Sequence, residues 1–101
     1  MIVPIHGLRY HNFIRPQVDD YVILVKEKNN IYDDMAIAAY NSKNQKFGYV
    51  SAKSSKNRKV YCKMLEDEFM GKVWAVYQNQ ILVELDFQTN VPQKSSTPQK
   101  R

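Results

Sequence analysis

Six short segments rich in β-branched and aromatic residues alternate with clusters of turn-forming residues, and this pattern constrains the fold most strongly. The clearest segment, residues 21–25 (YVILV), is apolar throughout and bounded by charges, which is typical of a buried strand. Residues 35–40 (MAIAAY) suit a helix or a strand; we favour a strand because residues 41–44 (NSKN) resemble a hairpin loop. The predicted strands are residues 2–9, 21–25, 35–40, 47–50, 72–77 and 81–87.

One helix is predicted between the fourth and fifth strands. Ser54 or Ser55 is a suitable N-cap, and apolar residues then recur on one face at helical spacing. We place this helix at residues 55–68, ended near Gly71. The order predicts a mainly β domain, a small and partly open six-stranded barrel with one α-helix, for which OB-like and SH3-like barrels are the candidates. Both folds bind ligands far more often than they catalyse reactions.

Length and charge indicate one domain followed by a tail. A chain of 101 residues is long enough for one core but too short for two. We assign residues 1–87 to the domain and expect residues 88–101, which are almost without apolar side chains, to form a disordered basic tail. Three basic and no acidic residues follow residue 87, so the net charge of +5 falls to +2 for the domain. Net charge alone is therefore weak evidence for a nucleic-acid partner.

The chain shows no membrane span and no secretory signal, so we expect a cytoplasmic protein without a membrane partner. The single cysteine, Cys62, cannot form an intramolecular disulfide, and His6 and His11 are too few for a zinc site. We therefore expect no cofactor and no metal.

Catalytic arrangements are not supported by the spacing of reactive residues. A cysteine enzyme would need Cys62 to meet one of two histidines near the N-terminus, and a metal nuclease would need acids converging from several strands. Three isolated glycines cannot make a phosphate-binding loop. A non-enzymatic role is the prediction, with an enzyme as a minor alternative.

Basic residues gather on the predicted helix. Five of them and no acid lie between Lys53 and Lys63, and acids follow at residues 66–68, which opposes the helix dipole. Lys56, Lys59 and Lys63 share one stripe that could meet phosphates together, although an ordinary solvated face explains the stripe equally well.

Residues 29–34 (NNIYDD) place a large aromatic and a β-branched residue inside a cluster of turn formers. Two explanations are open. Tyr32 fills a gap in the core, or Tyr32 and Asp33 are held out for a ligand.

Three segments, G-L-R-Y at 7–10, N-N-I-Y-D-D-M-A-I at 29–37 and F-G-Y-V at 47–50, together resemble the HIRAN domain. The resemblance runs in order from residue 5 to about residue 87, and the Asn-x-Tyr-Asp-x-x-Ala-Ile element is its most specific part. It implies a modified OB-like barrel whose site, in eukaryotic chromatin remodellers, captures the 3′ end of single-stranded DNA.

The resemblance also implies roles for individual residues. Arg9 and Tyr10 match a pair that grips the DNA backbone and stacks on a base, and Asn30 belongs to the specific element. In that element Tyr32 matches a stacking ring and Asp33 a carboxylate that accepts a hydrogen bond from the 3′-hydroxyl. Tyr49 stands where the eukaryotic domain has His, Lys53 lies one position past a phosphate-binding Lys, and Ile31 replaces a Pro.

The predicted function is a nucleic-acid-binding module for the 3′-OH end of single-stranded DNA, with repair or replication proteins as further partners. The alternative is a protein-interaction module that keeps the fold without the DNA site. The predicted binding residues are Arg9, Tyr10, Asn30, Tyr32, Asp33, Tyr49, Lys53, Lys56 and Lys59.

Overall fold

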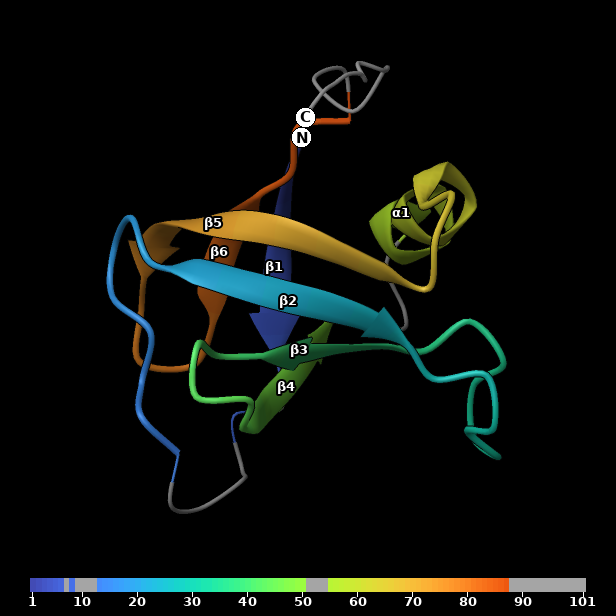
Figure 1. Cartoon of the computed structure of the whole chain (residues 1–101), viewed down its shortest axis with the longest axis horizontal. Coiled ribbons are helices and arrows are strands. Elements are labelled where there is room, and N and C mark those ends of the chain that lie inside the picture. The colour runs from blue at the N-terminus through green and yellow to red at the C-terminus, as the bar shows by residue number, and fades with distance from the viewer. Residues whose placement is uncertain (7, 9–12, 51–54, 88–101) are drawn as a thin grey trace, which may run out of the picture.

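The computed structural model describes residues 1–6, 8, 13–50 and 55–87, and its elements follow the predicted order (Figure 1). The strands are β1 (Ile2–His6), β2 (Tyr21–Lys26), β3 (Ile37–Tyr40), β4 (Lys46–Val50), β5 (Glu68–Val76) and β6 (Ile81–Glu84). The helix α1 (Ser55–Lys63) connects β4 to β5. None of the helices described is both long and apolar enough to cross a membrane.

The six strands form a closed barrel in the order β1-β4-β3-β2-β5-β6, and each is antiparallel to both neighbours. The prediction of a mainly β, OB-like barrel of six strands with one helix is confirmed, but the barrel is closed rather than partly open. Closure depends on β1, where Ile5 lies opposite both Val50 of β4 and Ile81 of β6. Ladder hydrogen bonds on both sides of β1 therefore leave the ring without an open edge.

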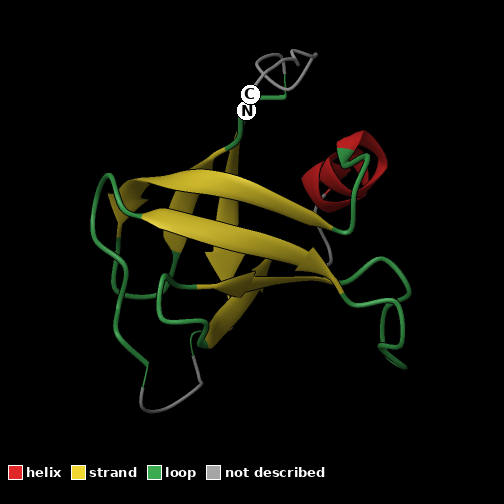
Figure 2. Ribbon diagram, in the orientation of Figure 1, coloured by secondary structure: helices red, strands yellow, loops and turns green. Residues whose placement is uncertain are grey.

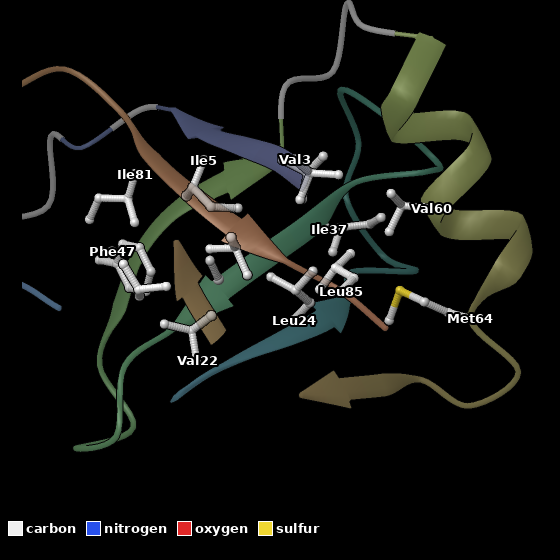
Figure 3. Close-up of a cluster of buried hydrophobic side chains, with 14 residues drawn as sticks. Val3, Ile5, Val22, Leu24, Ile37, Phe47, Val60, Met64, Ile81 and Leu85 are labelled. Atoms are coloured by element: carbon white, nitrogen blue, oxygen red, sulfur yellow. The ribbon is translucent and has the colours of Figure 1, made fainter. Parts of the chain in front are cut away.

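Alternation along the strands fills the barrel interior. In β2, Val22 and Leu24 are fully buried, whereas Tyr21 is exposed and Ile23 half-buried on the outer face. Val60 and Met64 extend from α1 and its C-terminal end into the same core, so the helix covers one end of the barrel (Figure 3). The other core residues come from the strands and their ends: Val3, Ile5, Val22, Leu24, Ile37, Ala39, Phe47, Val50, Val73, Ile81, Val83 and Leu85.

Two glycines permit close approaches inside this barrel. A Cβ on Gly48 would lie 2.5 Å from the backbone oxygen of His6, and one on Gly71 would lie 2.5 Å from Cγ1 of Val83. Gly71 was expected to end the helix, and this expectation is wrong. It lies within β5, where the absence of a side chain lets β5 pack closely against the residues of β6.

The helix is shorter than the predicted span of residues 55–68. Its last helical hydrogen bond runs from Met64 N–H to the Val60 carbonyl, and β5 begins at Glu68, opposite Val25. Backbone pairing explains the early end, because Lys26 N–H donates to the Asp67 carbonyl and the next residues join the β2 ladder. The acids at residues 66–68 thus lie outside the helix, and the last turn contains Lys63, which suits the dipole.

Several strands also begin or end at other residues than predicted. Strand β5 starts at Glu68 rather than residue 72, and β3 starts at Ile37 because residues 35 and 36 belong to the preceding turn. Strands β1 and β6 end earlier, at His6 and Glu84. The predicted hairpin loop after β3 is confirmed. Asn44 adopts the left-handed conformation there (φ 62°), and its N–H donates a hydrogen bond to the Asn41 carbonyl.

Candidate functional site

The turn of residues 27–36 joins β2 to β3 at the end of the barrel that α1 covers (Figures 1 and 2). Its neck is closed by a hydrogen bond from Glu27 N–H to the Ala36 carbonyl (2.9 Å). Asn30 N–H donates to the Glu27 carbonyl (3.2 Å) and begins the fold-back. We call these ten residues the Asn30 turn.

The Asn30 side chain organises the centre of this turn. Its Oδ1 accepts hydrogen bonds from the N–H groups of Tyr32 (2.8 Å) and Asp33 (3.1 Å). A short amide side chain bonding to backbone two and three residues ahead is the local chemistry that makes Asn favourable in turns. The backbone that carries Tyr32 and Asp33 is therefore held by side-chain hydrogen bonds rather than by a β ladder.

Tyr32 and Ile31 lie at the tip and are almost fully exposed, at 91% and 87%. Of the two explanations that the sequence left open, the gap-filling one is wrong for Tyr32. Neither residue contributes to the core, which is built by strands and α1. An exposed aromatic ring on a constrained turn is available to stack against a flat partner.

The two carboxylate oxygens of Asp33 differ in their hydrogen bonding within the described part of the chain. Its Oδ1 accepts from Met35 N–H (2.9 Å), and its carbonyl accepts from Ala36 N–H (3.2 Å). The second carboxylate oxygen, Oδ2, is buried and has no hydrogen-bond partner among the described residues. Such an oxygen costs about 1–3 kcal/mol when it stays unsatisfied, so it is a strong site for an incoming donor.

The first turn of α1 packs against the Asn30 turn. Asn57 is 3% exposed, and its Nδ2 donates to the Met35 carbonyl (3.2 Å), while its Oδ1 is buried without a partner in the described part of the chain. This contact fixes the helix beside the turn. Lys59 is exposed on the following part of α1, together with Arg58 and Lys63, whose Nζ lies 5.7 Å from the centre of the Phe87 ring.

Tyr49 points to a charged network instead of an open surface. Its hydroxyl donates to Glu27 Oε1 (2.9 Å) and accepts from Lys46 Nζ (3.0 Å), and Lys46 Nζ also donates to Glu27 Oε2 (2.7 Å). Glu27 Oε1 further accepts from Asn30 Nδ2 (3.1 Å). Two of the predicted site residues, Tyr49 and Asn30, therefore meet through a carboxylate that the sequence analysis did not select.

The network holds both of its charges firmly. Partial burial by itself raises the pKa of the Glu27 carboxyl, but hydrogen bonds from Lys46, Asn30 and Tyr49 outweigh it and hold the pKa below its ordinary value. The same hydrogen bonds to Glu27 and Tyr49 raise the pKa of Lys46 well above its ordinary range. The pair is thus charged at neutral pH.

The structure brings some of the nine predicted residues together. Asn30, Tyr32 and Asp33 share one turn, Tyr49 is joined to it through Glu27, and Lys59 lies on the helix packed beside it. Arg9, Tyr10, Lys53 and the side chain of Lys56 lie outside the described residues.

Glu27, Lys46 and Asn57 are the residues that sequence reasoning missed. Residues 26–28 (KEK) resemble an ordinary charged strand end, and Asn57 lies within the predicted helix with nothing in the local sequence to distinguish it. The available signal was the spacing from Glu27 to Asn30, which brings an acceptor-only side chain within reach of an amide across a turn.

A family model and a solved structure match this chain. The HIRAN domain model matches residues 1–95. The crystal structure of the HIRAN domain of human HLTF is similar, with a TM-score of 0.64 and 20% sequence identity over 82% of this chain and 69% of that chain. No curated protein matches at a significant level. The chain belongs to the HIRAN domain family, and this membership supports nucleic-acid binding.

Proposed function

We propose that this domain binds the 3′ end of single-stranded DNA, with the Asn30 turn as the end-recognising element. One observation carries the proposal: Tyr32 is exposed on a turn held by Asn30, directly beside a carboxylate one of whose oxygens has no hydrogen-bond partner in the described part of the chain. A ring can stack on a terminal base, and a carboxylate oxygen can accept a hydrogen bond from a terminal hydroxyl.

Tyr32 supplies affinity that is independent of sequence. Stacking of a base on an aromatic side chain contributes about 1–3 kcal/mol in single-strand binding proteins. The backbone N–H of Tyr32 is already bonded to Asn30, so the main chain loses little freedom when the ring is covered.

Asp33 supplies discrimination between end groups. A 3′-hydroxyl that displaces the groups covering Oδ2 would donate a hydrogen bond to this oxygen, which accepts none from the residues that the structure describes. A 3′-phosphate would bring negative charge against the carboxylate and would be repelled. The same geometry therefore favours a free 3′-OH end.

Phosphate contacts are proposed for several cationic residues of the domain. Lys59 is exposed on α1, which Asn57 holds beside the turn. Arg9 and Lys53 are proposed as further phosphate contacts from the sequence resemblance, and Lys56 from its place in the basic stripe of the helix, whereas Tyr10 is proposed as a base-stacking ring.

A protein-interaction module is the second candidate, and a separate surface favours it. Tyr21 of β2 and Met70 and Trp74 of β5 are each more than half exposed. Tyr21 lies opposite Lys72 and Ile23 opposite Met70, so these apolar residues share the outer face of the barrel wall. Apolar side chains gathered on a surface are typical of protein contacts.

The test measures fluorescence anisotropy of 5′-labelled oligonucleotides that end in 3′-OH or 3′-phosphate, at several salt concentrations. We expect tighter, salt-dependent binding of the 3′-OH end. Asp33→Ala should weaken binding of that end about tenfold or more and remove the preference. Arg9→Ala should weaken binding of both ends.

Asp34→Ala is the matched control, because this exposed neighbour carries the same charge on the same turn. It should leave the preference for 3′-OH intact, and thermal unfolding should show that all variants are folded. Equal binding of both ends by the wild-type domain contradicts end capture. Absence of salt-dependent binding removes the nucleic-acid function and leaves the protein-interaction candidate.

A further inference from the structure

Glu27 is the first residue of the Asn30 turn, and none of the proposed DNA contacts uses its carboxylate. Its carboxylate accepts hydrogen bonds from three side chains on two segments: Asn30 of the turn, and Lys46 and Tyr49 of β4. It is 22% exposed, and its ion pair with Lys46 spans 2.7 Å. A partly buried carboxylate with this many donors is built into the fold rather than solvated by chance.

The chemical character of Glu27 dictates the orientation of the Asn30 amide. An ionised carboxylate only accepts hydrogen bonds, so Asn30 must direct Nδ2 toward it. Oδ1 then points the other way, where it accepts from the N–H groups of Tyr32 and Asp33. If the amide were reversed, a donor would face both N–H groups and both bonds would be lost.

Lys46 and Tyr49 keep the carboxylate in place. Lys46 is bonded to both Glu27 and the Tyr49 hydroxyl, which in turn donates to Glu27, so the three groups form a closed triangle of hydrogen bonds. The backbone of Glu27 is fixed separately by its N–H bond to Ala36. The carboxylate therefore has little freedom to follow Asn30 if the amide rotates.

We propose that Glu27 is a positioning residue for DNA-end binding: through Asn30 it fixes the turn that presents Tyr32 and Asp33, with Lys46 and Tyr49 as its supports. The inference rests on the proposed function. It also assigns Tyr49 a supporting role through Glu27, in place of the direct nucleic-acid contact predicted from the sequence.

Glu27→Gln is the sharpest test because it keeps the size of the side chain. The new amide can accept from Lys46 with its oxygen, and its NH₂ group then faces Asn30 and favours the reversed Asn30 amide. Glu66→Gln removes the same charge from an exposed position and is the control. Tyr49→Phe removes one support and should have a smaller effect in the same direction.

Two measurements are made on each variant: water-exchange rates of backbone amides by NMR, and the anisotropy titration with 3′-OH and 3′-phosphate oligonucleotides. In Glu27→Gln we expect faster exchange at Tyr32 and Asp33, unchanged exchange at the Leu24 amide in the barrel, and about tenfold weaker binding of the 3′-OH end. Glu66→Gln should match the wild type in both measurements.

The outcomes separate the two proposals. Unchanged exchange at Tyr32 and Asp33 in Glu27→Gln overturns the positioning role, as does faster exchange with undiminished 3′-OH binding. A uniform rise in exchange over the whole barrel shows global destabilisation and also overturns it. Failure of the wild-type domain to bind DNA overturns the proposed function, and the role of Glu27 in binding falls with it.

Discussion

The side-chain oxygen of Asn30 bonds two consecutive backbone N–H groups, and this small arrangement determines how the tip of the turn is presented. Because Tyr32 is held through its backbone, its ring needs no core contacts and can stay exposed. Asp33 uses one oxygen for the turn and leaves the other unpartnered among the described residues. Tyr32 and Asp33, the two residues proposed to contact the DNA end, therefore both depend on Asn30, which fixes their backbone.

A pH dependence of stability follows from Glu27. Its pKa is lowered on folding, so the folded state binds this proton more weakly than the unfolded chain does. The resulting stabilisation is fully present above the ordinary carboxyl pKa of 4.5 and is lost as the pH falls through the lower, folded value. Lys46 has a raised pKa, so its contribution is present below its ordinary value of 10.5 and lost only at higher pH.

We therefore expect the melting temperature of the wild-type domain to fall more steeply below the ordinary carboxyl pKa than that of Glu27→Gln. Thermal unfolding followed by circular dichroism, from neutral pH down to about pH 3, measures this difference. Glu66→Gln serves again as the charge control. Parallel wild-type and Glu27→Gln curves would contradict a stabilising Glu27–Lys46 pair.

At the level of elements, the hairpin between β3 and β4 is organised by one buried amide. Asn41 is 5% exposed; its Nδ2 donates to the Ile14 carbonyl and to Gln45 Oε1, and its Oδ1 accepts from the N–H groups of Lys43 and Gln45. It thus joins the hairpin to the loop that precedes β2. Lys46, which supports Glu27, is the first residue of β4 and follows the loop of this hairpin.

Replacing Asn41 with Ala should destabilise the domain by about 1–3 kcal/mol, because buried backbone groups of the hairpin lose their partners. Urea unfolding measures the change. Asn29→Ala is the matched control, since Asn29 is exposed, and it should stay within about 0.5 kcal/mol of the wild type. An equal loss in both variants would show that the amide network of Asn41 adds nothing.

For the molecule as a whole, stability and site geometry both depend on closing the barrel. Strand β1 joins β4 to β6, and the residues that flank β1 and β6 reinforce this pairing: the Met1 amino group donates to the Leu85 carbonyl (3.0 Å), and Leu85 N–H donates to the Met1 carbonyl (2.8 Å). Helix α1 closes one end with Val60 and Met64. The Asn30 turn thus extends from a ring whose strands support one another.

Ile5→Ala tests this closure. Ile5 is fully buried and pairs with both neighbouring strands, so we expect a loss of about 2–5 kcal/mol in the free energy of unfolding. Ile14→Ala is the control at a 59% exposed position and should have little effect. Denaturant unfolding followed by Trp74 fluorescence is a direct measurement, because Trp74 is the single tryptophan. A loss no greater than that of Ile14→Ala would contradict the closure role.

Much of this architecture follows from the sequence alone. Runs such as residues 21–25 must be buried on one face, and turn formers such as residues 41–44 must reverse the chain, so the order of elements is a local property. The Asn30 turn is predictable for the same reason, since the Asn oxygen reaches only residues close to it in the chain.

Tertiary structure decided the rest. The helix ends at Lys63 because β5 finds hydrogen bonds on β2, and Gly71 is required by side chains of β6 and its end, far along the chain. The Glu27 network joins residue 27 to residues 46 and 49, and a local sequence pattern does not predict hydrogen bonds between residues so far apart in the chain. Local chemistry thus determined the segments and the turn, whereas closure, strand ends and the support behind Asn30 depend on partners that only the folded barrel brings within hydrogen-bonding distance.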